Sequence, residues 1–112
     1  MTKRLRIYVA GPLTSNDLKV FKQNVKKAKE IGEQIFKKGH LPYVPHAHFY
    51  DWDIHMYKDY EFLLAHGIDI LEKWADALFY IDPSKGADIE KKRAEELGLK
   101  IFTDISEIEE VK

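Results

Sequence analysis

The sequence contains no cysteine, which excludes disulfide bonds, thiolate nucleophiles and thiolate metal sites together. Net charge is also nearly absent, because 18 basic residues stand against 19 acidic ones and leave a formal charge of −1. That balance gives the chain no general attraction for a polyanion. The lysines crowded between residues 19 and 38 fit the polar face of one helix better than a nucleic-acid patch. We therefore expect no nucleic-acid partner.

Long apolar runs are missing as well. The apolar run near the start of the chain is too short for the core of a signal peptide, and none approaches membrane-spanning length. We expect a soluble, cytoplasmic protein without a membrane partner. The chain has 112 residues, of which 45% are hydrophobic and 33% charged. This composition fits a single domain over residues 1–112 with a small core.

Short apolar segments alternate with segments of helical periodicity. Four segments have the β-branched, aromatic or uniformly apolar character of buried strands, namely 5–10, 41–44, 77–81 and 100–102. Three others carry apolar residues at helical spacing, namely 16–38, 60–74 and 87–97. We expect the aromatic and histidine-rich residues 45–56 to form a loop, and a short acidic tail to follow the last strand.

Strands that alternate with helices predict an α/β fold with a parallel sheet and right-handed crossovers. Pro42 has no N–H to donate, so its strand belongs at a sheet edge. The simplest strand order is then 2-1-3-4, that of a flavodoxin-like three-layer fold with a small parallel sheet. Winding reverses between strands 1 and 3, and ligands bind at the carboxyl ends of strands at such a point. The loops at residues 11–12 and 84–86 lie at this mouth.

One carboxylate occupies a position where packing favours an apolar side chain. Glu90 falls on a helical stripe whose other members are apolar: Ala87, Ala94 and Leu97. Burial of an unpaired ion costs on the order of several kcal/mol, which favours a functional role. An ion pair with Arg93 or a nearby lysine is the main alternative. A capping box is disfavoured, because Ser84 precedes Glu90 by six residues instead of three.

The residues before this helix are suited to an anion. Ser84, Gly86 and the free backbone amides of the first helical turn would form a site of positive potential, to which Lys85 adds charge. A serine directly before a helix is also a common N-cap, and that interpretation stays open. The anion hypothesis gains weight from the inward-facing Glu90 that follows.

Two motifs carry a resemblance to a known family. They are Tyr8-Val9-Ala10-Gly11-Pro12, which closes strand 1, and Ser84-x-Gly86-x-x-x-Glu90, which follows strand 3. Together they resemble the nucleoside 2-deoxyribosyltransferase superfamily, including its deoxynucleoside 5′-monophosphate N-glycosidase branch. The resemblance implies that Glu90 attacks C1′ of the sugar and expels the base, and that Tyr8 lies beside it.

The resemblance also implies a substrate class. Family members that act on free nucleosides carry aspartate at the position of Ser84, whereas the monophosphate branch carries serine. A carboxylate would repel a phosphate dianion, while a hydroxyl group and helix amides would hold it. The implied substrate is therefore a nucleoside 5′-monophosphate, whose sugar and phosphate are bound by Gly11, Pro12, Ser84 and Gly86.

The implied reaction is a retaining double displacement, in which a glycosyl ester forms on Glu90 and is then released. Release by water makes the enzyme a hydrolase, which we favour, and release by a second base makes it a transferase. A second acid should assist the leaving base, and Asp69 is the nearest match to the family's acid. Asp69 is equally well explained as a surface residue of its helix. The chemistry calls for no cofactor, and the family implies a homodimer or larger homo-oligomer.

The histidine-rich stretch offers a rival hypothesis. His46, His48, Asp51 and His55 are all competent ligands for zinc or a similar ion. No second cluster or open-site pattern supports a metal, and aromatic residues interleaved with histidines suit stacking on a base. We therefore favour substrate contacts from His46 and His48, with plain loop packing as the remaining alternative.

Two other functions stay open. The same crevice would serve a non-catalytic module that senses a nucleotide, because a fold and a pocket do not guarantee turnover. A metal-dependent hydrolase that uses the stretch from His46 to His55 is the other. The sequence leaves undecided the preferred base, the choice between ribose and 2-deoxyribose, and the choice between hydrolysis and transfer.

Overall fold

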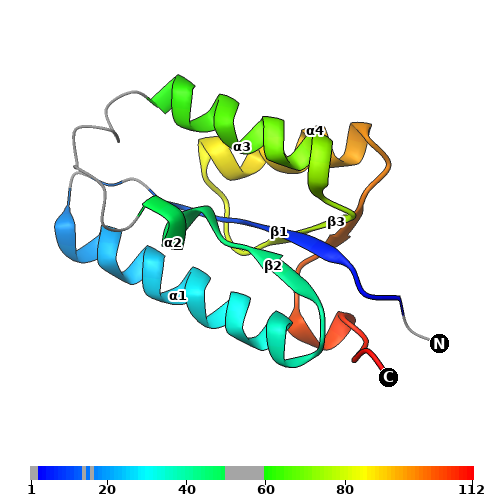
Figure 1. Ribbon diagram of the computed structural model, residues 1–112. Coiled ribbons are helices and arrows are strands. Elements are labelled where there is room, and N and C mark those ends of the chain that lie inside the picture. Colours follow the sequence, from blue (N-terminus) through cyan, green and yellow to red (C-terminus); the bar gives the residue numbers. More distant parts are fainter. Residues whose placement is uncertain (1–2, 14, 16, 50–59) are drawn as a thin grey trace.

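Strands and helices alternate along residues 3–13, 15, 17–49 and 60–112, the part of the chain that the computed structural model describes. The strands are β1 (Arg6–Ala10), β2 (Leu41–Tyr43), β3 (Ala77–Tyr80) and β4 (Lys100–Phe102). The helices are α1 (Leu18–Lys37), α2 (Pro45–Phe49), α3 (Tyr60–Trp74) and α4 (Lys85–Glu96), and the 3-10 helix η2 (Ile105–Glu107) follows the last strand. Figure 1 shows three layers, with α1 below the sheet and α3 and α4 above it.

The sheet is parallel throughout, and its strand order is β2-β1-β3-β4. The predicted flavodoxin-like α/β fold and its strand order are therefore confirmed. Pro42 lies in the edge strand β2, where it was expected. In β1, Tyr8 lies beside Tyr43 of β2 and Leu78 of β3. Side chains in register on neighbouring parallel strands share one face of the sheet.

The alternation of side chains along β1 divides the core in two. Ile7 and Val9 pack with residues of α1, whereas Tyr8 and Ala10 pack with residues of α3 and α4. The α1 side is completed by Ala28, Ile35, Ala77, Phe79, Phe102 and Ile108. The α4 side is completed by Leu71, Leu78, Ala87 and Ala94. As a result, β1 delivers the phenol of Tyr8, which is 1% exposed, to the side of the sheet that α4 covers.

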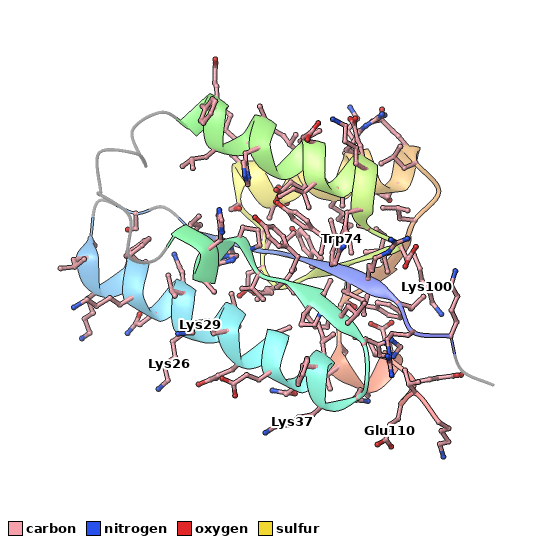
Figure 2. The ribbon with its side chains drawn as sticks, in the orientation of Figure 1. Lys26, Lys29, Lys37, Trp74, Lys100 and Glu110 are labelled. Atoms are coloured by element: carbon pink, nitrogen blue, oxygen red, sulfur yellow. The ribbon has the colours of Figure 1, made fainter. Side chains whose placement is uncertain are left out.

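Helix α1 turns an apolar stripe toward the sheet and its lysines toward solvent. Asp17 caps the first turn, because its carboxylate accepts a hydrogen bond from the Lys19 N–H at 2.9 Å. The helix therefore begins at Leu18, two residues after the predicted start. Figure 2 shows Lys26 and Lys37 pointing away from the sheet, as a polar helix face requires.

Two boundaries near the mouth of the sheet differ from prediction. Residues 45–49, predicted as loop, form the one-turn helix α2, while residues 50–56 of that predicted loop lie outside the described residues. Helix α4 begins at Lys85, two residues early, because Ser84 caps it. Leu97 is the C-cap residue and is 37% exposed, so the inner stripe of α4 ends at Ala94. No helix within the described ranges is long and apolar enough to cross a membrane.

Candidate active site

The centre of the site is a phenol and a carboxyl group brought together from opposite ends of the chain. The hydroxyl of Tyr8, in β1, donates a hydrogen bond to Oε2 of Glu90, in the second turn of α4. Ala87 and Ala94 are buried on the same stripe of α4, so packing against the sheet turns Glu90 inward. Arg93, the partner named in the alternative ion-pair interpretation, pairs with Glu72 at 3.0 Å and with Glu96 at 3.5 Å.

Gly67 of α3 covers the other side of this pair. A Cβ atom at this position would lie 2.6 Å from Oε2 of Glu90 and closer still to the Tyr8 hydroxyl. Both distances are shorter than a Cβ atom makes in real structures. Only a residue without a side chain lets α3 pass this close to the pair. In the sequence, Gly67 shares a helical stripe with Leu64 and Leu71, but nothing local indicated what it faces.

Burial dominates the electrostatics of the pair. It raises the pKa of Glu90 to about 7, and the hydrogen bond from Tyr8 opposes that shift only in part. The pKa of Tyr8 is raised well above its ordinary value, first by burial and then by the negative charge of Glu90. Tyr43, on the neighbouring strand, also has a raised pKa, first from burial and then from Glu90. The two tyrosine rings lie 5.6 Å apart. Glu90 thus titrates in the physiological range, beside phenols that stay protonated.

The N-terminus of α4 lies in the same cavity. Ser84 is its N-cap, since Oγ of Ser84 accepts a hydrogen bond from the Ala87 N–H at 3.0 Å. The capping interpretation is therefore correct, and it also orients this helix end toward the cavity. Ser84, Lys85, Gly86 and Ala87 all line the cavity wall, so the positive end of the helix is available to an anion there.

The cavity has a volume of about 500 Å³, which suits a small molecule. Besides Tyr8 and Glu90, it is lined by every predicted binding residue except His48: Gly11, Pro12, His46, Ser84 and Gly86. Much of the remaining wall is apolar and comes from Leu13, Pro45, Leu63 and Leu64. Sequence reasoning missed Leu63 and Leu64, because an apolar residue of a helix gives no sign of whether it faces the core or a cavity.

His46 and His48 have different surroundings. The ring of His46 is 2% exposed, and its Nε2 lies 3.2 Å from the carbonyl oxygen of Gly11 and 3.0 Å from that of Pro12. Burial lowers the pKa of His46 to about 4, against the opposing effect of these hydrogen bonds. His48 is exposed and stacks on the ring of His66 at a centroid distance of 5.6 Å. Only His46 of the two therefore reaches the cavity wall.

The metal hypothesis receives no geometric support from the described residues. Asp51 and His55 lie outside the described ranges, so their part in it stays a prediction. Among the residues that are described, no three His, Asp or Glu side chains gather as metal ligands would.

Asp69 lies away from the cavity. It is exposed on α3 and pairs with Lys73 one turn later at 2.8 Å. Asp69 follows Gly67 by two residues, which turns it by about 200° around the helix axis. Since Gly67 faces the Tyr8–Glu90 pair, Asp69 faces solvent. The geometry agrees with Asp69 as a surface residue of its helix. No contact among the described residues supports its predicted role as an assisting acid.

Comparison with known proteins adds one match. Residues 5–104 match the family model described as Domain of unknown function (DUF7768). No curated protein matches the sequence. The matched range contains all four described strands and the helices between them, including Tyr8, Ser84 and Glu90. The chain therefore belongs to the DUF7768 family.

Proposed function

We propose that this protein cleaves the N-glycosidic bond of a nucleoside 5′-monophosphate, with Glu90 as the nucleophile. The observation that carries this function is the Tyr8–Glu90 pair in a cavity that also contains the N-terminus of α4. Tyr8 and Gly67 occupy the surroundings of Oε2, which leaves Oε1 of Glu90 as the attacking atom.

The cavity offers a site of positive potential for the phosphate end of the substrate and an apolar wall for its base. The 5′-phosphate binds at the N-terminus of α4, where the helix amides and Lys85 supply positive potential. The flat face of the base packs against the wall formed by Leu13, Pro45, Leu63 and Leu64. The sugar lies between them, with C1′ toward Glu90.

The reaction proceeds in two displacements. Oε1 of Glu90 forms a bond to C1′ while the C1′–N bond breaks, and its electron pair leaves with the base. The base takes up a proton from solvent, because Asp69 lies outside the cavity. Water then attacks C1′ while the bond between C1′ and Oε1 breaks, which releases the sugar 5-phosphate and regenerates the Glu90 carboxylate, and the attacking water gives up a proton to solvent. A second base in place of water would give transfer instead of hydrolysis.

A base-release assay tests this function. The protein is incubated with the 5′-monophosphates of each common ribo- and 2′-deoxyribonucleoside, and free base is measured by chromatography. Glu90→Ala should lower release by at least about 1,000-fold while monophosphate binding, measured by calorimetry, stays within a few-fold. Glu95→Ala, an exposed carboxylate of the same helix, is the matched control and should retain activity. Release by Glu90→Ala at the wild-type rate would refute the assigned nucleophile.

A nucleotide sensor without turnover is the second candidate. It is favoured by the position of Asp69, because the acid that the resemblance implies lies outside the cavity that the described residues form. The same assay separates the two, since a sensor binds one of the monophosphates and releases base from none. The resemblance further implies a homodimer, for which light scattering after size-exclusion chromatography should give twice the mass of one chain.

A further inference from the structure

His46 connects two elements of the cavity wall that are far apart in the sequence. Its Nε2 lies within hydrogen-bond distance of the carbonyl oxygens of Gly11 and Pro12, 35 and 34 residues away. Carbonyl oxygens only accept hydrogen bonds, so Nε2 must carry the proton and donate to both. The start of α2 is in this way tied to the segment that leaves β1.

The other ring nitrogen of His46 cannot serve a ligand. Nδ1 is enclosed and has no hydrogen-bond partner among the described residues. When Nε2 carries the proton of a neutral ring, Nδ1 is an acceptor only. The lowered pKa of His46 agrees with a ring that stays neutral, because a second proton would leave an unsatisfied buried donor on Nδ1.

We propose that His46 is a positioning residue that fixes the carbonyl groups of Gly11 and Pro12, and with them one wall of the cavity, without a hydrogen bond to the substrate. This replaces the direct contact expected from the sequence. Its consequence for catalysis rests on the proposed function and on the sugar contacts of Gly11 and Pro12 that the resemblance implies. Its structural consequence does not, because it concerns hydrogen bonds within the protein.

His40 provides a matched control within the same chain. It is also 2% exposed and also joins distant backbone groups. The Leu5 N–H donates to Nδ1 of His40 at 3.0 Å, and its Nε2 lies 2.6 Å from the carbonyl oxygen of Glu109. This bridge lies at the amino ends of the strands, away from the cavity. Loss of His40 therefore reports the general cost of losing a buried histidine.

Amide hydrogen exchange measured by NMR tests the structural part. In His46→Leu, the amides of Gly11 and Leu13 should exchange about ten-fold faster than in His40→Leu. His46→Gln keeps an N–H donor on a side chain of similar reach and should restore the wild-type exchange rates. If His46→Leu does not fold, His46→Asn replaces it, because its shorter amide does not reach both carbonyl groups. Unchanged exchange at Gly11 and Leu13 in the folded variant would overturn the positioning role.

Kinetics test the catalytic part. His46→Leu should raise KM by the same factor, about ten-fold, for every nucleoside 5′-monophosphate that is cleaved, with kcat within about two-fold of wild type. His46→Gln should restore KM, and His40→Leu should leave it unchanged. A KM increase that differs between bases, or that glutamine does not rescue, would instead mean direct contact. Failure of the wild-type protein to release any base would count against the proposed function, while the exchange experiment would still decide the role of His46.

Discussion

At the scale of single residues, the ionisation of Glu90 controls whether it can attack. Burial raises its pKa to about 7, so a large share of the protein carries a protonated Glu90 at neutral pH. A nucleophile must be ionised, so kcat/KM should rise with pH and level off above about pH 7. Tyr8→Phe removes the hydrogen bond that lowers this pKa and should move the midpoint of the rise upward.

The pH–rate profiles of wild type and Tyr8→Phe, measured with one monophosphate, check this expectation. Comparison of the two proteins cancels the titration of the substrate phosphate, whose second pKa is about 6. A midpoint that moves downward in Tyr8→Phe, or that does not move, would contradict the assigned hydrogen bond.

Ser84 gives a second prediction at this scale. Aspartate is as good an N-cap as serine, so Ser84→Asp should keep α4 intact while it places a carboxylate where the phosphate binds. We expect kcat/KM for a monophosphate to fall by at least about 100-fold and that for the free nucleoside to fall far less or to rise. Ser84→Asn, an uncharged cap, is the control and should lose little. Equal losses in the two variants would argue against a phosphate at this position.

At the scale of elements, the approach of α3 to the Tyr8–Glu90 pair depends on Gly67. Gly67→Ala would place a Cβ atom 2.6 Å from Oε2 of Glu90, so either α3 moves outward or the pair separates. We expect unfolding to become easier by about 1–3 kcal/mol, although alanine is the better helix former, and base release to fall at least about ten-fold.

Urea denaturation and the base-release assay measure both effects. The control is Ala65→Gly, an exposed position two residues earlier on α3, which should cost about 1 kcal/mol through helix propensity and leave activity unchanged. Full activity and stability in Gly67→Ala would mean that α3 does not pack on the pair.

At the scale of the whole molecule, Glu90 and His46 make stability depend on pH in opposite directions. In the unfolded protein Glu90 loses its proton near pH 4.5, whereas in the folded protein it keeps the proton until about pH 7. The contribution of Glu90 to stability therefore falls as pH rises between these values. In the unfolded protein His46 releases its proton near pH 6.5, whereas in the folded protein it is already neutral above about pH 4. Its contribution therefore rises with pH over that range. The two contributions offset each other in the wild type.

Variants separate the two contributions. The unfolding free energy of wild type minus that of Glu90→Gln should fall by about 2 kcal/mol between pH 4.5 and 7. The unfolding free energy of wild type minus that of His46→Gln should rise by a similar amount between pH 4 and 6.5. Urea denaturation at half-unit pH steps measures both, and the differences cancel all other titrating groups. A difference that does not change with pH would show that the group in question is not buried as described.

Much of this protein is determined by local pattern. Alternating apolar strands and periodic helices indicated the layers, and Pro42 indicated the edge strand. The stripe that contains Ala87 and Ala94 indicated that Glu90 points inward. Such features can be read from the sequence because they depend on residue spacing within one element.

Contacts between elements were decided by the tertiary structure alone. The fit of Gly67 against Glu90, the enclosure of His46 by the segment after β1, and the rotation of Asp69 into solvent depend on how α2 and α3 approach the sheet. That approach is set by the packing of many side chains that are distant in the sequence, and no single segment encodes it. The sequence by itself determined the layers, the edge strand and the inward stripe of α4, and long-range packing decided which residues reach the cavity.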